Sequence, residues 1–261
     1  MAVITLTTDF GRRDHYVASM KGIILQIDPG ATIVDVCHEV QAHQVLQAAF
    51  ILRSVWPAFA AGTIHVVVVD PQVGTDRRIL AARYEDRVVL APDNGVVSLV
   101  HRDYRLQELY LVQNHQLFVQ PVSATFHGRD IFAPVAAHLS RGMGLGNVGA
   151  PTNQLELLNL PVPRPLKNDG LAGEVLYVDR FGNLVTNLSR RELARVLLRR
   201  KGPQVWLEQT CVGPIRQSYA EVAEKQPLAL IGSADLLEVA VNQASAAETF
   251  GAGAGTSVRV E

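Results

Sequence analysis

The stretch VVVVDPQVGTDRR, residues 66–78, joins a strongly apolar strand pattern to a charged turn. Its four consecutive valines predict a strand buried on both faces, which is typical of a parallel sheet. Such a strand normally ends in turn residues, but this one runs into Asp70, a turn, and then Asp76, Arg77 and Arg78. We therefore expect a carboxylate and a guanidinium side by side at the end of a core strand. The alternative interpretation is a structural salt bridge that only closes the turn.

Strand and helix patterns alternate around this stretch up to about residue 140. Strands are predicted at 2–9, 31–36, 63–70, 78–85, 87–95 and 108–114, and helices at 15–27, 42–55 and 128–140. This alternation predicts an α/β domain with a largely parallel central sheet over residues 1–141. In such sheets, ligands bind beyond the carboxyl ends of the strands.

The rest of the chain has a different pattern. Residues 142–169 are rich in Pro, Gly and Asn, which predicts an exposed connector. Residues 170–261 hold short strand patterns at 171–179, 204–210, 227–233, 236–242 and 257–261, with one helical pattern at 189–200. Short strands separated by turn signals predict a smaller, β-barrel-like domain.

The composition narrows the class of protein. The 261 residues are 48% hydrophobic and carry a net charge of −1, so a globular protein without a nucleic-acid-binding face is expected. Cys37 and Cys211 lie far apart and form no metal-ligand spacing, which favours a reduced, metal-free, cytoplasmic protein. The first residues do not form a signal sequence, and no apolar run reaches the roughly 20 residues that span a bilayer. We expect neither secretion nor membrane insertion.

Polar residues follow four of the predicted strands. They are Asp9, Asp70, Asp93 with Asn94, and, in the second domain, Asp179 with Asn183 and Asn187. Any one of them alone is explained by a turn, because Asp and Asn stabilise turns with their own side chains. Four such strand ends, three of them in one domain, favour a binding site.

His127, in SATFHGRDIFAP, falls at the start of a predicted helix. The positive end of the helix dipole disfavours an imidazolium, so we expect His127 to be neutral near pH 7. The alternative is a half-buried histidine that only caps the helix. Arg129 and Asp130 are expected to form a surface or capping pair.

Five motifs in this order carry a resemblance: TTDFG, VVDPQVGTDRR, APDNG, TFHGRDIFAP and VDRFGNLVTN. Together they resemble the S-adenosyl-L-methionine hydroxide adenosyltransferase family, relatives of fluorinating and chlorinating enzymes. The resemblance covers essentially the whole chain and the two-domain layout. It implies that water-derived hydroxide attacks C5′ of S-adenosylmethionine and displaces methionine, giving adenosine. It also implies a homotrimer with sites between subunits, and no cofactor.

The family's catalytic Asp, Arg and His match Asp70, Arg77 and His127. The halogenating relatives lack this set: they carry Tyr at the position of Asp70, and the fluorinating enzyme has Ser at the position of Gly128. The fluorinating enzyme also has a long insertion after the third strand, for which this chain has no room. The resemblance therefore implies hydrolysis rather than halogenation.

The resemblance also implies which residues bind the substrate. Asp9 matches the residue that binds the ribose diol, Asp179 the ammonium ligand, with Asp14 as a second candidate, and Ser233 the residue that contacts the methionine carboxylate. An adenine edge needs an amide that both donates and accepts, which is the chemistry of Asn183. Further substrate-binding candidates are Phe10, Asn94 and Phe181. Two departures leave the methionine contacts open: Ala234 stands where the fluorinating enzyme has Arg, and DRFGN is one residue shorter.

The chemistry fits these residue types. A sulfonium leaves as a neutral thioether, so no general acid is needed, but the water must be oriented and must lose a proton. Asp70 and neutral His127 both remain candidates for the base. Arg77 does not deprotonate, and it is expected to hold Asp70 and the water.

Three other functions compete with hydrolysis. The first is a halide-dependent adenosyltransferase. The second is a non-catalytic protein that binds S-adenosylmethionine or adenosine. The third is metal-assisted hydrolysis, which the sequence disfavours because it has no His and carboxylate pair at ligand spacing.

Overall fold

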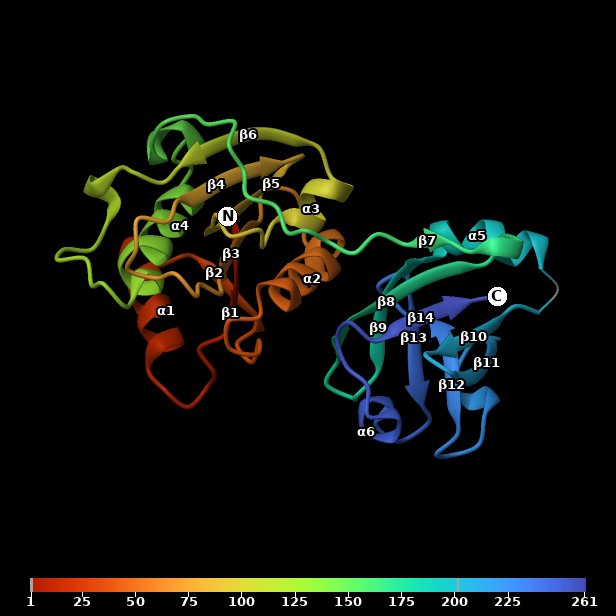
Figure 1. Cartoon of the computed structure of the whole chain (residues 1–261). Coiled ribbons are helices and arrows are strands. Elements are labelled where there is room, and N and C mark those ends of the chain that lie inside the picture. Colours follow the sequence, from red (N-terminus) through yellow and green to blue (C-terminus); the bar gives the residue numbers. More distant parts are fainter. Residues whose placement is uncertain (1, 201) are drawn as a thin grey trace. The chain divides into compact units, whose positions relative to one another are not determined.

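The computed structural model describes residues 2–200 and 202–261 (Figure 1). The chain forms two compact units: the first ends at Leu158, and the second runs from Asn159 to Glu261. The division falls inside the segment rich in Pro, Gly and Asn at 142–169. Residues of that segment also belong to the first unit's core, where Leu145 and Val148 are buried.

The first unit is built on a six-stranded sheet with the strand order β2-β1-β3-β5-β4-β6. Its strands are β1 (Val3–Thr8), β2 (Thr32–Cys37), β3 (Ile64–Val68), β4 (Ile79–Tyr84), β5 (Arg87–Pro92) and β6 (Leu106–Leu111). Strand β1 is parallel to β2 and β3, and β3 is parallel to β5, whereas β4 is antiparallel to both of its neighbours. The predicted largely parallel α/β sheet is confirmed.

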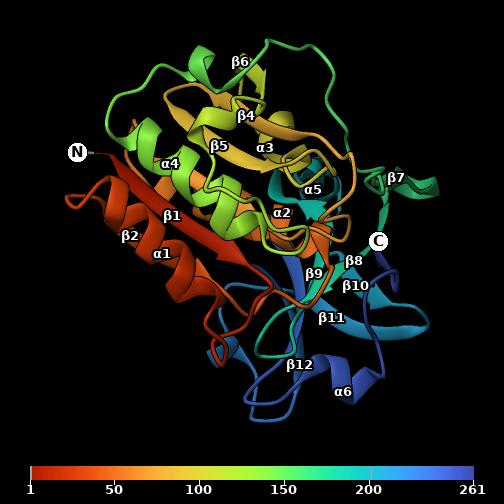
Figure 2. The ribbon, with the colours of Figure 1, turned by 90° about the vertical axis from the view of Figure 1, so that its left-hand side faces the viewer.

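Helices cover both faces of this sheet. They are α1 (Tyr16–Ile27), α2 (Val45–Val55), α3 (Ser98–Asp103) and α4 (Ala133–Ser140). Helices α1 and α4 lie side by side over β1, while α2 and α3 lie on the opposite face (Figures 1 and 2). Side chains alternate along β1, so Ile4 and Leu6 are buried against α1 through Met20 and Ile24.

The sheet register sets the position of the polar strand ends. Thr8 at the end of β1 pairs with Val68 at the end of β3, and Val66 pairs with Leu90 of the parallel strand β5. The residues that follow these three strands therefore emerge at one edge of the sheet. Two features that the sequence did not predict also lie in this unit, α3 and a π-helical turn at Gly128–Phe132 that precedes α4.

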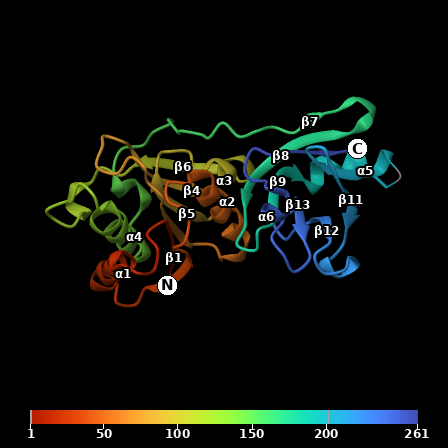
Figure 3. The ribbon, with the colours of Figure 1, turned by 60° about the horizontal axis from the view of Figure 1, so that its bottom comes forward.

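The second unit is a closed β-barrel of seven strands. The strands are β8 (Leu171–Val178), β9 (Leu184–Ser189), β10 (Gln204–Leu207), β11 (Thr210–Arg216), β12 (Pro227–Ile231), β13 (Leu236–Val241) and β14 (Ser257–Val260), with a short β7 (Arg164–Pro165) beside β8. Strand β14 pairs with both β10 and β8, and this second pairing closes the barrel. The predicted barrel is confirmed. Short helices α5 (Arg190–Arg199) and α6 (Ala246–Phe250) lie beside its strands (Figure 3).

The sequence patterns missed three elements of the barrel, namely β9, β11 and α6. Strand β9 reads as a polar stretch, but Thr186 inside it is fully buried and donates from Oγ1 to the carbonyl of Leu237 at 2.8 Å. The expectation of a single helix in this part was wrong. Helix α6 is short, with Ser245 as its N-cap and Gly251 in the left-handed region at its end.

Within residues 2–200 and 202–261, none of the helices has the length and apolar character that crossing a membrane requires.

Candidate active site

Asp70, Arg77 and His127 come together in the first unit. Asp70 follows β3, Arg77 precedes β4, and His127 precedes the π-helical turn. The Nε of Arg77 donates to Oδ2 of Asp70 at 2.5 Å, and its Nη2 lies against the same oxygen. Nη2 also lies 2.8 Å from Nδ1 of His127. The ion pair is buried, since the side chains of Arg77 and Asp70 are only 5% and 4% exposed.

Two loops meet to form this arrangement. Residues 70–77 form the first loop. The second is the part of the chain that includes Ala124 and ends at His127. Gly74, at a φ of 82°, lies directly against the backbone of Ala124, and a Cβ at Gly74 would meet the carbonyl oxygen of Ala124 at 2.3 Å. Only glycine fits this approach, because the space is closed and the backbone is in the left-handed region.

The environment of His127 keeps its imidazole neutral. Burial and the nearby Arg77 guanidinium lower its pKa, while Asp70 and Asp130 act in the opposite direction. The expected neutral state is therefore supported. The cause differs, because burial and Arg77 lower the pKa here, whereas the prediction from the sequence rests on the helix dipole. Arg129 and Asp130 form the expected pair at 2.6 Å, and the buried carboxylate also accepts from the backbone N–H of Ser123 at 2.8 Å.

The hydrogen bond from Arg77 fixes the tautomer of His127. A guanidinium has only donors, so Nδ1 of His127 must be the acceptor. In the neutral ring the proton then resides on Nε2. The two oxygens of Asp70 have different partners. Oδ2 accepts from both Nε and Nη2 of Arg77, whereas within the described part of the chain Oδ1 accepts only from the backbone N–H of Gln72, at 3.3 Å.

A cavity of about 350 Å³ lies beside these groups. Its wall includes Asp9, Phe10, Tyr16, Ala42, His43, Val68, Asp70, Val73, Thr125, Phe126, His127 and Gly128. Three aromatic rings form one side of it, with centroids of Phe10, Tyr16 and Phe126 between 5.1 and 6.0 Å apart. A Cβ at Gly128 would lie 3.1 Å from the Phe10 ring, so glycine keeps this wall in place.

The predicted substrate-binding residues of the first unit do not all lie at this cavity. Asp9 lines the cavity and accepts from the backbone N–H of His43 at 3.0 Å. Phe10 lines it as well and also packs on the hydrophobic core. Asp14 is exposed and is not among the residues of the cavity wall. Asn94 lies at a separate cavity of about 510 Å³.

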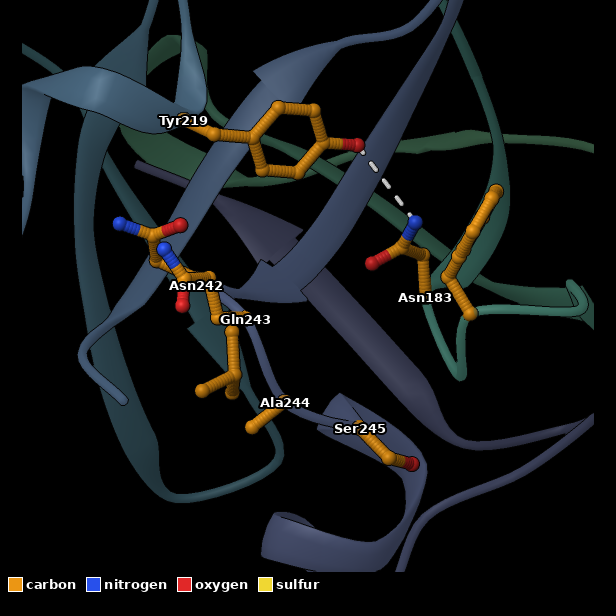
Figure 4. Close-up of a pocket in the computed structure, with 8 residues that line it drawn as sticks. Asn183, Tyr219, Asn242, Gln243, Ala244 and Ser245 are labelled. Atoms are coloured by element: carbon orange, nitrogen blue, oxygen red, sulfur yellow. Dashed lines mark hydrogen bonds between the residues drawn. The ribbon is translucent and has the colours of Figure 1, made fainter. Parts of the chain in front are cut away.

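The barrel unit has a cavity of its own, also about 510 Å³ in volume. Its wall consists of Phe181, Asn183, Tyr219, Val241, Asn242, Gln243, Ala244 and Ser245 (Figure 4). Asn183 and Tyr219 face each other across it, with Nδ2 of Asn183 3.5 Å from the phenol oxygen. Phe181 is 77% exposed, so its ring is free to cover a planar ligand.

Asp179 supports this cavity from behind. Its Oδ1 accepts from the backbone N–H groups of Phe181 and Asn183, at 2.8 and 2.9 Å, and Oδ2 accepts from the Asn183 amide at 2.9 Å. This bonding holds the Asn183 side chain in place, and its amide nitrogen faces the phenol oxygen of Tyr219 (Figure 4). Asp179 and Ser233 are absent from the cavity wall, and Ser233 is exposed.

Glu238 adds a second carboxylate near Asp179. Burial and the charge of Asp179 raise its pKa to about 7. Burial, followed by the charges of Glu238 and Asp179, raises the pKa of Tyr219, so its phenol stays protonated.

Several residues of the two cavities were not predicted. Asn242 directly follows β13, so the strand-end criterion applied above would have found it. Tyr219, Tyr16, His43 and Phe126 carry no such signal, because only the folded loops bring them to a cavity. Among the residues that the structure describes, no group of three or more His, Cys, Asp or Glu side chains is arranged to hold a metal ion.

Comparison with known proteins gives a consistent result. The family model for the SAM hydroxide adenosyltransferase N-terminal domain matches residues 4–149, and the model for the C-terminal domain of the same family matches residues 173–259. A protein of Thermus thermophilus named (R)-S-adenosyl-L-methionine hydrolase is 36% identical, with 100% of each chain covered.

A further sequence and a solved structure are also similar to this chain. A fluorinase from an Actinoplanes species is 28% identical over 99% of this chain and 97% of its own. The crystal structure of an uncharacterized conserved protein from Thermotoga maritima matches with a TM-score of 0.91 and 34% identity, covering 98% of this chain and 99% of that one.

Proposed function

The chain belongs to the SAM hydroxide adenosyltransferase family, and on that premise we propose that it hydrolyses S-adenosyl-L-methionine to adenosine and L-methionine. The buried contact of Arg77 with both Asp70 and His127 is the single observation that carries the proposal. A protein that only binds its ligand has no need for a buried ion pair and a neutral histidine at one cavity wall.

In the reaction, an oxygen lone pair of water forms the new bond to C5′. The C5′–S bond breaks, and its electron pair goes to sulfur, so methionine leaves as a neutral thioether. The water proton passes to a base. No charge builds up on the leaving group, so catalysis depends on orienting and deprotonating the water.

We assign the role of proton acceptor to Asp70. Nδ1 of His127 is occupied by Arg77, and Nε2 then carries the ring proton, so neither nitrogen has a free lone pair. Oδ1 of Asp70 receives one long hydrogen bond and has a lone pair to spare. His127 donates from Nε2 to the oxygen of the nucleophile and orients it, while Arg77 stabilises the negative charge that develops.

The remaining residues are assigned to parts of the substrate. We propose that Asp9 binds the ribose diol beside Phe10, and that Asn183 binds the adenine edge under the exposed ring of Phe181. Asp179 provides the negative potential that attracts the ammonium group. Supporting observations are the carboxylate of Asp9 in the first cavity and the oriented amide in the second.

The relatives' name adds a stereochemical detail. The Thermus thermophilus protein is named for the (R) form of the sulfonium. We propose that this chain also prefers the (R) epimer at sulfur. Neither a metal nor a cofactor is part of the proposed reaction.

We also propose a cytoplasmic homotrimer. Each site would combine the catalytic groups of one subunit's first unit with the barrel cavity of a neighbour. The resemblance to the family supports the trimer, and the distribution of complementary groups over two separate cavities is consistent with it. Cys37 and Cys211 are both free, as expected in a reducing compartment. A monomer found by light scattering would contradict the proposed trimer and its shared sites.

The test is to incubate the purified protein with each sulfonium epimer in halide-free H₂¹⁸O and to follow adenosine and methionine by chromatography. Adenosine with ¹⁸O at its 5′ oxygen, formed faster from the (R) epimer, is expected. The variant His127→Ala should lose most of this activity. His115→Ala serves as the control, because His115 lies outside both cavity walls.

Two results would contradict the proposal. Tight binding without adenosine would indicate a binding protein, in which Asp70 and Arg77 form a structural pair. A product that appears only when chloride or fluoride is added would indicate a halide-dependent adenosyltransferase.

A further inference from the structure

Asp93 and Asn94, which directly follow β5, bond to both ends of the loop that carries Asp70 and Arg77. Neither residue belongs to the cavity that contains Asp70 and His127. Their bonds reach the residue before Asp70 and the residue after Arg77.

Asn94 holds the first end of the loop. Its Nδ2 donates to the carbonyl oxygen of Val69 at 2.9 Å, and its Oδ1 accepts from the backbone N–H of Val96 at 3.2 Å. Val69 is fully buried and directly precedes Asp70. Both ends of the amide are therefore engaged within the protein, so Asn94 is better suited to hold the backbone than to contact substrate.

Asp93 holds the second end. Its Oδ2 accepts from Nε of Arg78 at 2.7 Å, and its backbone N–H donates to the carbonyl oxygen of Arg78 at 3.0 Å. Its other oxygen accepts from the backbone N–H of Glu156 at 2.8 Å. The carboxylate is 1% exposed, and Arg78 directly follows Arg77. A buried charge with these partners holds a fixed position.

Packing alone does not hold the loop between these ends. Residues 71–76 are all exposed. A polar cavity of about 510 Å³ lies beside the loop, and its wall contains Gln72, Asp76, Arg77 and Arg78 along with Asp93 and Asn94. Because one side of the loop faces open space, its end positions depend on hydrogen bonds and the ion pair.

We propose that Asp93 and Asn94 are positioning residues that hold Asp70 and Arg77 in register with His127. This proposal rests on the proposed hydrolase function, for which the three groups must be placed together. A displacement of about 1 Å at a reacting group costs on the order of 100-fold in rate. The two residues thus act through Asp70 and Arg77 without touching the substrate.

The chain offers a closely matched control. Asn114 also follows a strand, β6, and donates from Nδ2 to the carbonyl oxygen of Asn147 at 2.9 Å. Its Oδ1 accepts from the backbone N–H two residues later, Gln116, at 3.2 Å. These bonds have the same lengths as those of Asn94, but their partners are Asn147 and Gln116, and the helical turn at His115–Leu117 separates Asn114 from His127 along the chain.

The experiment compares Asn94→Asp and Asn94→Ala with Asn114→Asp and Asn114→Ala. Asp keeps the shape of the side chain but turns the donor into an acceptor that faces the Val69 carbonyl, whereas Ala removes both bonds without adding charge. For each variant kcat, KM, the melting temperature and the pKa of His127, from NMR titration, are measured. The NMR readout does not need activity.

In the Asn94 variants kcat should fall 10- to 100-fold while KM changes less than about threefold. The pKa of His127 should rise toward its ordinary value, because Arg77 is no longer held against the ring. Asn114 variants should leave kcat and the His127 pKa unchanged. Asp93→Asn, which weakens the bond to Arg78, should repeat the Asn94 pattern.

Unchanged kcat and unchanged His127 pKa in the Asn94→Ala variant would overturn the proposal. Equal losses of kcat in the Asn94 and Asn114 variants, in proportion to lost stability, would overturn it too. If the wild type forms no adenosine, the proposed function fails, but the His127 pKa in the variants still decides whether these residues position the loop. If Asn94→Asp does not fold, Asn94→Ala and Asp93→Asn supply the same comparison.

Discussion

The Nη2 of Arg77 donates a hydrogen bond to Nδ1 of His127 at 2.8 Å. Because the same nitrogen also contacts Asp70, its two hydrogens are divided between the carboxylate and the imidazole. The guanidinium therefore does more than neutralise a buried charge. It fixes the tautomer of the neutral histidine, and it leaves Nδ1 without a free lone pair for the water proton.

Arg77→Lys should separate charge from geometry. A lysine keeps the positive charge but lacks the planar fork that serves Asp70 and His127 together. We expect kcat to fall by about 100-fold or more, since a preorganised donor is lost, while the protein stays folded. Steady-state kinetics and the melting temperature measure the two effects.

A matched control for that variant is Arg83→Lys. Arg83 also pairs with a carboxylate from its Nε, that of Glu108 at 2.6 Å, but this pair is about one-third exposed and lies outside both cavity walls. Its replacement should leave kcat unchanged. If Arg77→Lys were as active as Arg83→Lys, a simple positive charge would be sufficient at position 77.

The activity should have an acid limb set by His127. The pKa of His127 is lowered by burial and by Arg77, so the neutral ring persists to a lower pH than in an ordinary histidine. Protonation at Nδ1 would place an N–H against the guanidinium and break their hydrogen bond. We therefore expect kcat/KM to fall as pH drops through this lowered pKa, below the ordinary value of about 6.5.

His127→Gln provides the comparison for the pH profile. Glutamine does not titrate, so the part of the acid limb due to His127 should disappear, although the overall rate will be lower. The NMR titration of His127 in the wild type should give the same pKa as the kinetics. An acid limb of identical position and shape in the glutamine variant would assign it to another group.

The extent to which sequence predicts this protein differs between its parts. The buried strand before Asp70 and the alternation of strands and helices are local patterns, and they gave the parallel sheet. The resemblance of five motifs brought Asp70, Arg77 and His127 together before the structure did. By contrast, β9 was missed because it contains the polar residue Thr186, which is buried and donates a long-range hydrogen bond to the carbonyl of Leu237.

Contacts between loops could not be predicted from the sequence either. Tyr219 lies in the segment between β11 and β12 and reaches Asn183 only in the folded barrel. Asn94 lies outside the cavity of His127, and its amide donates to the carbonyl of Val69. No pattern in the sequence indicates this hydrogen bond. Strand ends can be predicted from periodicity, whereas the partners of polar side chains depend on the tertiary fold.

Gly74→Ala should disrupt the site although Gly74 lies on an exposed loop. The new Cβ would meet the carbonyl oxygen of Ala124 at 2.3 Å, and Gly74 has a φ of 82°. The loop of Asp70 and Arg77 must then move away from the loop of His127. We expect a large loss of kcat, measured together with the free energy of unfolding in urea.

Gly62→Ala is the control for backbone strain. Gly62 has almost the same φ, 81°, but no atom lies within 4 Å of its Cβ position. It should cost only the roughly 1–2 kcal/mol of a left-handed conformation and leave kcat unchanged. Equal kcat in the two variants would mean that catalysis does not depend on the close approach of the two loops.

His65 should make the stability of the protein depend on pH. The ring is fully buried, its Nδ1 bonds to Thr5 at 2.8 Å, and its Nε2 has no hydrogen-bond partner among the residues that the structure describes. Burial, with a smaller effect of Arg87, lowers the pKa of His65 to about 4. The unfolded chain takes up a proton near pH 6.5, but the folded protein does not, so acidification favours unfolding.

The sign and size of this effect follow from proton linkage. The contribution of His65 to stability is fully present above pH 6.5 and is lost as pH falls toward 4, at up to about 1.4 kcal/mol per pH unit. Between pH 6.5 and pH 5 the free energy of unfolding should therefore fall by about 1–2 kcal/mol more in the wild type than in His65→Gln, which cannot titrate. Urea unfolding at both pH values measures the difference. Equal changes in the two proteins would mean that His65 binds its proton in the folded state as readily as in the unfolded chain.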